Sequence, residues 1–90
     1  MASHSKHLHM VYFARIREAI GTSDEDINPP DSATTIHAIL DWLSEQDEKY
    51  AAAFAPRERL RAAVNQSYVG LDDGFKDGDE IAIFPPVTGG

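Results

Sequence analysis

The chain has 90 residues, 42% of them hydrophobic, and a formal net charge of -7 at pH 7, so we expect one small globular domain. This negative charge would repel phosphate backbones and anionic lipids, which argues against nucleic-acid and membrane binding. No apolar run approaches the roughly 20 residues of a membrane span. The start MASHSKHLH lacks a secretory signal, and the chain has no cysteine, so we expect a cytoplasmic protein.

Two strands and a short helical segment are expected in the first third of the chain. Residues 8–14 are rich in β-branched and aromatic side chains, which predicts a central strand. A short turn or a helical stub closed by Gly21 should follow. Residues 24–27 are short, charged and followed by Asn28 and two prolines, as in an edge strand. We expect these two strands to pair as a hairpin.

The clearest helix follows the segment SATT, where Thr34 or Thr35 can cap its start. The segment DEKYAAAF either extends this helix or forms a second one, and Pro56 ends it. Four aliphatic side chains have the spacing of one helix face and should pack on a sheet: Ile36, Ile39, Leu40 and Leu43.

Three further strands are expected after this helix. A strand from Leu60 should lead through a turn at Asn65 and Gln66 to a short strand at 67–69. Two Asp-Gly turn signals surround Phe75, which we interpret as a buried plug.

The last strand covers residues 80–84 and ends before Pro85, which cannot donate to a sheet ladder. Helix and strands are segregated rather than alternating, and this order predicts an α+β roll. We expect one main helix to pack on one face of a mixed sheet, with the last strand beside the first and the other face partly open.

Three segments resemble a known family: YFARIREAIGT, LRAAVNQ and DGDEIAIFPPVTGG. They are similar to the small, sulfur-carrying subunits of molybdopterin synthase, the MoaD family of the MoaD/ThiS ubiquitin-like sulfur carriers. The last segment is the most specific, because a terminal Gly-Gly alone also occurs in ubiquitin-like modifiers and in the thiamine-pathway carrier. The resemblance implies a β-grasp domain at residues 8–84, after a flexible start at 1–7 and before an extended tail at 85–90.

The resemblance gives the carboxyl end a chemical role. A terminal carboxyl has a pKa of about 3.3–3.7, so at neutral pH it is an anion and must be activated before it can react as an acyl donor. In the family, an ATP-dependent adenylating enzyme of the ubiquitin-activating (E1-like) type turns the equivalent of Gly90 into an acyl-adenylate. Sulfur transfer then gives a thiocarboxylate. The chain itself would bind no cofactor, because ATP is used by the activating partner.

The composition of the tail suits insertion into a narrow channel. Glycines without Cβ atoms pass where other residues would obstruct, and prolines favour an extended exit from the sheet. The last five residues span about 16 Å at about 3.3 Å per residue. The residues expected to enter the partner, ahead of the reactive Gly90, are Pro85, Pro86, Val87, Thr88 and Gly89.

The resemblance implies that the tail enters the large subunit of molybdopterin synthase, in a heterotetramer of two small and two large subunits. There two thiocarboxylates would convert a cyclic pyranopterin monophosphate into the dithiolene of molybdopterin. If Ile81 and Ile83 face the helix, Phe84 faces outward. Together with Phe13 and Tyr68 it would form an apolar patch for this partner. The alternative is that these aromatic side chains only complete the core.

Other clusters have simpler interpretations. His4, His7 and His9 would suggest a metal site, but histidines near a chain start are more often incidental, and we assign no metal.

Three alternating arginines would meet an acidic patch on the activating enzyme or, as we favour, form a solvated strand face: Arg57, Arg59 and Arg61. Five acidic residues would steer a basic partner or, as we favour, form turns: Asp72, Asp73, Asp77, Asp79 and Glu80. We interpret Asn65 and Gln66 as residues that form a turn and its hydrogen bonds.

Three other functions stay open on the sequence. The same tail chemistry would serve a sulfur carrier of another pathway, such as that of the thiamine thiazole. An adenylated Gly-Gly end would also serve a protein modifier that forms isopeptide bonds with lysines. A purely structural binding domain leaves the tail unexplained and is the least favoured.

Overall fold

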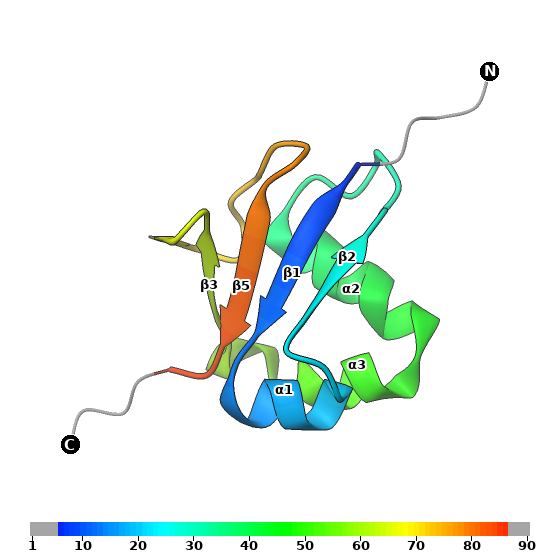
Figure 1. Cartoon of the computed structure of the whole chain (residues 1–90), viewed down its shortest axis with the longest axis vertical. Coiled ribbons are helices and arrows are strands. Elements are labelled where there is room, and N and C mark those ends of the chain that lie inside the picture. Colours follow the sequence, from blue (N-terminus) through cyan, green and yellow to red (C-terminus); the bar gives the residue numbers. More distant parts are fainter. Residues whose placement is uncertain (1–5, 87–90) are drawn as a thin grey trace.

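The computed structural model describes residues 6–86, which form a five-stranded sheet with helices on one side (Figure 1). Of the tail, only Pro85 and Pro86 lie within the described residues. In chain order the elements are β1 (Leu8–Tyr12), α1 (Ala14–Ile20), β2 (Asp24–Ile27), α2 (Ile36–Gln46), α3 (Glu48–Ala53), the 3-10 helix η1 (Arg57–Arg59), β3 (Arg61–Val64), β4 (Ser67–Val69) and β5 (Glu80–Phe84).

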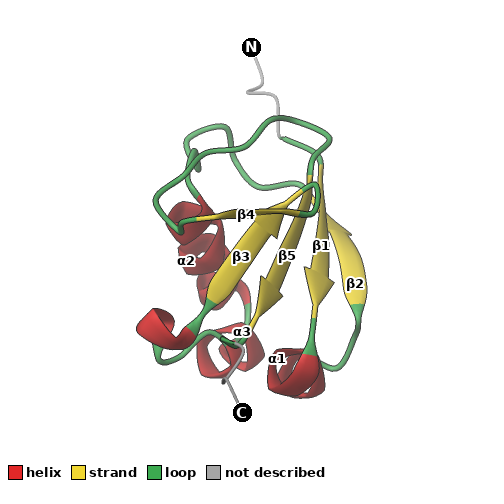
Figure 2. Cartoon of the chain, turned by 90° about the vertical axis from the view of Figure 1, so that its left-hand side faces the viewer, coloured by secondary structure: helices red, strands yellow, loops and turns green. Residues whose placement is uncertain are grey.

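The strands lie in the order β2-β1-β5-β3-β4. The first and last strands, β1 and β5, run parallel, with Met10 opposite Ile81, and the other neighbours are antiparallel. Figure 2 shows α2 and α3 behind the sheet and the other face without a helix over it. The expected α+β arrangement, with a mixed sheet and the last strand beside the first, is therefore confirmed. The middle strand is β5, whereas the first strand, expected to be central, lies beside it as β1 and ends at Tyr12.

The connection between β1 and β2 is a helix rather than the tight turn of a hairpin. The two strands are antiparallel as expected, with Leu8 opposite Ile27, but α1 lies between them. Gly21 ends α1 with a φ of 93°, and its N–H donates to the Arg17 carbonyl at 2.8 Å. Such a left-handed cap favours glycine, so the closing residue is confirmed, and of the two alternatives the helix rather than the turn is present.

The main helix starts where the sequence predicts. The Thr35 hydroxyl accepts a hydrogen bond from the Ala38 N–H at 3.1 Å, as expected of a capping residue. Asp47 caps a separate helix by accepting from the Lys49 N–H at 2.9 Å, so DEKYAAAF forms the second helix α3. The four-residue stripe of α2 is buried against the sheet.

Two expectations about the second half need correction. Residues Arg57–Arg59 form η1 rather than the start of a strand, because the Arg59 and Leu60 N–H groups donate to the carbonyls of Pro56 and Arg57. Phe75 packs against the core but is only half-buried, so it is not a fully buried plug. Across residues 6–86, no helix has the length and apolarity needed to cross a membrane.

Candidate functional site: the aromatic patch and the tail exit

The tail leaves the sheet from the end of its middle strand. Ile81 and Ile83 are fully buried on the helix side of β5, and alternation along a strand turns Phe84 to the opposite face. Pro85 and Pro86 follow and have no N–H to continue the sheet ladder. The remaining tail residues and the reactive end predicted from the sequence lie outside the described residues: Val87, Thr88, Gly89 and Gly90.

The three aromatic residues expected to face a partner lie together on the open face of the sheet, and we call them the aromatic patch: Phe13, Tyr68 and Phe84. The rings of Phe13 and Phe84 meet edge to face with centroids 6.3 Å apart, and those of Tyr68 and Phe84 are 5.8 Å apart. The exposed fractions of Phe13 and Tyr68 are 46% and 83%. These two side chains therefore do not complete the core, whereas Phe84 is half-buried between them.

A groove of about 760 Å³ lies beside the aromatic patch and reaches Pro85 and Pro86. Its floor includes Ala63 and Ala82, which face each other across β3 and β5. Small methyl groups there leave a hollow that larger side chains would fill, and the surrounding aromatic rings form its walls. An apolar hollow rimmed by exposed aromatic side chains is typical of a protein-binding surface.

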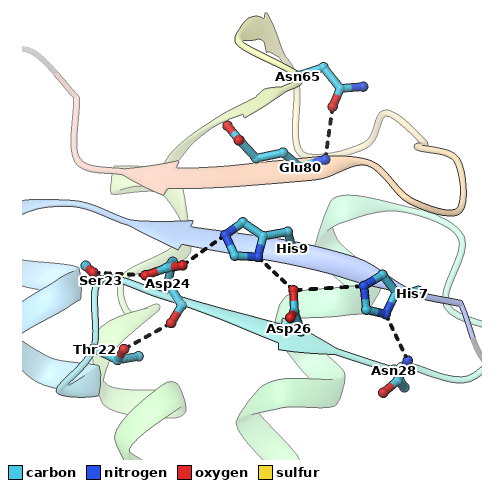
Figure 3. Close-up of polar contacts among 9 residues, drawn as sticks. All are labelled: His7, His9, Thr22, Ser23, Asp24, Asp26, Asn28, Asn65 and Glu80. Atoms are coloured by element: carbon cyan, nitrogen blue, oxygen red, sulfur yellow. Dashed lines mark hydrogen bonds and ion pairs between the residues drawn. The ribbon is translucent and has the colours of Figure 1, made fainter.

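The turn between β3 and β4 holds Asn65 and Gln66 at φ values of 49° and 73°, as in the two-residue turns that join hairpin strands. The Asn65 side chain donates to Asp79 Oδ1 at 2.9 Å. It also accepts from the Glu80 N–H at 3.0 Å (Figure 3). The Asn65 amide thus links this turn to the start of β5, which agrees with the structural interpretation.

Within the acidic cluster, carboxylates accept backbone hydrogen bonds in the turns between β4 and β5. Asp73 accepts from the Gly70 N–H and Asp79 from the Lys76 N–H, both at 2.7 Å. The bond from Lys76, together with the one from Asn65, lowers the pKa of Asp79. The turn-forming interpretation thus accounts for these two carboxylates.

The arginines predicted to share a strand face do not do so. Arg57 turns towards α2, where its Nη2 lies 2.9 Å from Asp41 Oδ1 and its Nη1 lies 3.0 Å from His37 Nδ1. Arg59 lines a cleft of about 350 Å³ at the tail exit, together with Arg15. An alternating pattern in the sequence predicts one shared strand face, but η1 ends this alternation before Arg61 and turns Arg57 and Arg59 in other directions.

A charged cluster on β1 and β2 was missed by the sequence analysis. His9 Nδ1 lies 2.7 Å from Asp26 Oδ1, and His9 Nε2 lies 3.0 Å from Asp24 Oδ2 (Figure 3). The hydrogen bond with Asp26 raises the pKa of His9, and the same bond lowers the pKa of Asp26. His7 Nε2 lies 3.9 Å from Asp26. Strand alternation combined with the antiparallel pairing would have predicted these contacts.

His7 and His9 contact carboxylates rather than forming a metal site within residues 6–86. His4 lies outside the described residues, while His7 and His9 contact carboxylates of β2. Between residues 6 and 86, no group of three or more histidine, cysteine or acidic side chains is placed to hold a metal ion. The contacts of His7 and His9 therefore join the start of the sheet to the carboxylates of β2.

Comparison with known proteins gives a consistent assignment. The profile of the ThiS family matches residues 10–90. The molybdopterin synthase sulfur carrier subunit of Haemophilus influenzae is 40% identical over 92% of this chain and 99% of its own length. That of Escherichia coli is 38% identical over 90% of this chain and 96% of its own. Both matches cover almost the whole domain.

Solved structures show the same fold. A putative molybdopterin converting factor subunit 1 from Pyrococcus furiosus superposes with a TM-score of 0.72, at 30% identity over 92% of this chain and all of its own. Subunit 1 of the molybdopterin-converting factor from Helicobacter pylori, in a complex with subunit 2, superposes with a TM-score of 0.60, at 21% identity over 93% of this chain and 99% of its own. A ubiquitin from Caldiarchaeum subterraneum superposes with a TM-score of 0.57, at 15% identity over 96% of this chain and 99% of its own. The fold is therefore ubiquitin-like. The chain therefore belongs to the ThiS family, among the molybdopterin synthase sulfur carrier subunits.

Proposed function

We propose that this chain is the sulfur carrier subunit of a molybdopterin synthase in molybdenum cofactor biosynthesis. The observation that carries the proposal is the direct continuity of β5 with the tail. Phe84 belongs to the aromatic patch, and the next residue begins the segment PPVTGG. A partner that covers the aromatic patch would therefore receive the tail at the same time.

The tail chemistry we propose takes place on Gly90. Its carboxylate oxygen attacks the α-phosphorus of ATP on an E1-like adenylating enzyme, and pyrophosphate leaves. Hydrosulfide then attacks the carbonyl carbon and AMP leaves, which gives a thiocarboxylate at the chain end. No cysteine of this chain is needed, because sulfur is carried by the terminal residue. We place this step in the cytoplasm, where ATP is at hand.

The receiving partner we propose is the large subunit, in an assembly of two small and two large subunits. Its channel would take the tail from Pro85 to Gly89, so that the thiocarboxylate sulfur bonds to a carbon of a cyclic pyranopterin monophosphate. Water would then cleave the acyl–sulfur bond, which leaves the sulfur on the pterin and restores the Gly90 carboxylate. Catalytic acids and bases would then belong to the large subunit. The chain would divide into a start at 1–7, a β-grasp domain at 8–84 and a tail at 85–90. The relatives' shared role and the groove beside the tail exit support this proposal.

Variants of the chain end test the proposal. We expect that deletion of Gly90, or addition of one residue after it, abolishes molybdopterin formation in a reconstituted synthase and leaves the thermal unfolding unchanged. Thr88→Ser is the matched control, because it preserves the tail length and both glycines. Retained synthesis by the deleted or extended chain would refute the mechanism. A ladder of adducts seen with an antibody against the tail would instead favour a protein modifier.

A further inference from the structure

The arginines of this acidic protein are concentrated at one end of the sheet. All five stand in α1 or in residues 57–61, and both segments lie near the point where β5 ends (Figures 1 and 2). Asp77 precedes the start of β5 at the other end of the sheet, where it accepts from the His7 N–H, whereas Asp72 lines a cleft with Arg57 and Arg61. The tail exit therefore gathers the arginines of the chain, although Glu18 and Glu58 stand in the same two segments.

Three of these arginines surround the first residues of the tail, and we call them the arginine collar: Arg15, Arg59 and Arg61. Arg15 and Arg59 line the 350 Å³ cleft with Pro85 and Pro86. Arg61 lies opposite Phe84 across β3 and β5 and lines an adjoining groove of about 410 Å³ with Tyr68 and Pro86. The arginine collar is thus continuous with the aromatic patch.

The arginine collar has no carboxylate partner within residues 6–86, although the chain has 15 acidic residues. Arg15 Nη1 donates to the Ala53 carbonyl at 3.2 Å, and Arg61 Nη1 donates to the Glu58 and Leu60 carbonyls at 3.2 and 2.9 Å. All three residues are exposed. Arg57, just beside them, does form an ion pair with Asp41. The collar therefore presents guanidinium groups that other molecules can reach.

We propose that the arginine collar binds aspartate or glutamate side chains of the large subunit at the mouth of the channel that receives the tail. This inference rests on the proposed function, since it concerns the same partner. The planar guanidinium matches a carboxylate with two parallel hydrogen bonds. Because the collar adjoins the aromatic patch, a large subunit seated on the patch would also reach the collar. Charge pairing at a rim speeds association and fixes orientation, which here would align the tail with its channel.

The affinity for the cognate large subunit, measured with the full chain at low and high salt, tests this inference. We expect the triple variant R15Q/R59Q/R61Q to bind about tenfold more weakly at low salt, which corresponds to about 1.4 kcal/mol. The difference should shrink at high salt, because screening weakens exposed pairs. The matched control is K6Q/K49Q/K76Q, which removes the same number of positive charges outside the collar and should bind like the wild type. Thermal unfolding of each variant checks that it is folded.

Crosslinking identifies the chemical group that meets the collar. In R15K/R59K the charges are kept, and a carbodiimide can join the introduced amines to carboxylates, whereas arginine does not couple. We expect crosslinks from positions 15 and 59 to aspartate or glutamate residues of the large subunit. Equal affinity of the collar and control variants would overturn the inference, as would crosslinks to the adenylating enzyme alone. Binding that still depends on Phe84 and on the tail would then leave the proposed function standing.

Discussion

The ring of Phe84 meets the ring of Phe13 edge to face, with 6.3 Å between the centroids and 83° between the ring planes. Phe84 ends β5 and Phe13 directly follows β1, and these strands are parallel neighbours. The Phe13 N–H also donates to the Ile83 carbonyl at 3.2 Å. The ladder that joins the first and last strands thus also sets the spacing of the aromatic patch beside the tail exit.

The first prediction is that Phe84→Glu weakens binding to the large subunit by about tenfold or more. Central aromatic anchors often contribute about 2 kcal/mol or more to an interface, and a carboxylate would have to lose its water there. Binding is measured by titration calorimetry and folding by thermal unfolding. Gln46→Glu adds the same charge at the exposed end of α2 and should bind normally. Unchanged affinity of the Phe84 variant would remove this residue from the interface.

The second prediction concerns a carboxylate that accepts hydrogen bonds from two buried tyrosines. Glu25 Oε2 accepts from the Tyr12 hydroxyl at 2.7 Å and also from the Tyr50 hydroxyl. Burial, and after it this hydrogen bond, raise the pKa of both tyrosines. Each buried hydroxyl without an acceptor costs about 1–3 kcal/mol. We therefore expect Glu25→Ala to lower the free energy of unfolding in urea by about 2–4 kcal/mol.

The control for this prediction removes the hydroxyls as well as their acceptor. The triple variant Y12F/Y50F/E25A leaves no buried hydroxyl unsatisfied, so it should be more stable than Glu25→Ala alone. If Glu25→Ala lost less than about 0.5 kcal/mol, the shared hydrogen bonds would not stabilise the fold in solution.

The third prediction is a pH dependence of the cluster on β1 and β2. Three carboxylates face His9, namely Asp24, Asp26 and Glu80, and His7 lies beside Asp26. The pKa of His9 is raised in the folded state, so protonated His9 stabilises the fold. This stabilisation is fully present below the unfolded pKa of about 6.5 and is lost as pH rises through the raised folded value.

We therefore expect the stability difference between the wild type and His9→Gln to be largest below the unfolded pKa of about 6.5 and to shrink as pH rises through the raised pKa of His9. Urea unfolding of both chains across this range measures it. Lowering the pH further brings a second loss, because the pKa of Asp26 is lowered in the folded state and its stabilisation disappears as it becomes protonated. A stability difference that stays constant or grows as pH rises through this range would contradict the ion pairing.

Local sequence signals were sufficient for most of the elements. Pro85 ended β5, the Asn65-Gln66 pair marked the turn before β4, and Gly21 closed α1, because each acts through its own backbone conformation. The outward direction of Phe84 followed from strand alternation. These features could be predicted because each depends on residues close together in the chain.

Contacts between distant segments were not visible in the sequence. Arg57 turns to Asp41, which lies on another helix, so its place in an alternating run was misleading. The sequence places Glu25 in a charged edge strand, which gives no sign that its hydrogen-bond partner Tyr50 lies on α3. Arg15 reaches the tail exit only because α1 folds back beside the end of β5. Such contacts depend on how the elements pack, which no local pattern encodes.

The most direct test of the account is the intact mass of the chain after incubation with ATP, its adenylating enzyme and a sulfur donor. The account predicts a mass gain equal to the replacement of one oxygen atom by sulfur, mapped by fragmentation to Gly90. A chain lacking Gly90 should show no gain, and a known sulfur carrier serves as the positive control for the enzyme. An unchanged mass of this chain, while the positive control is converted, would contradict the proposed role as a sulfur carrier.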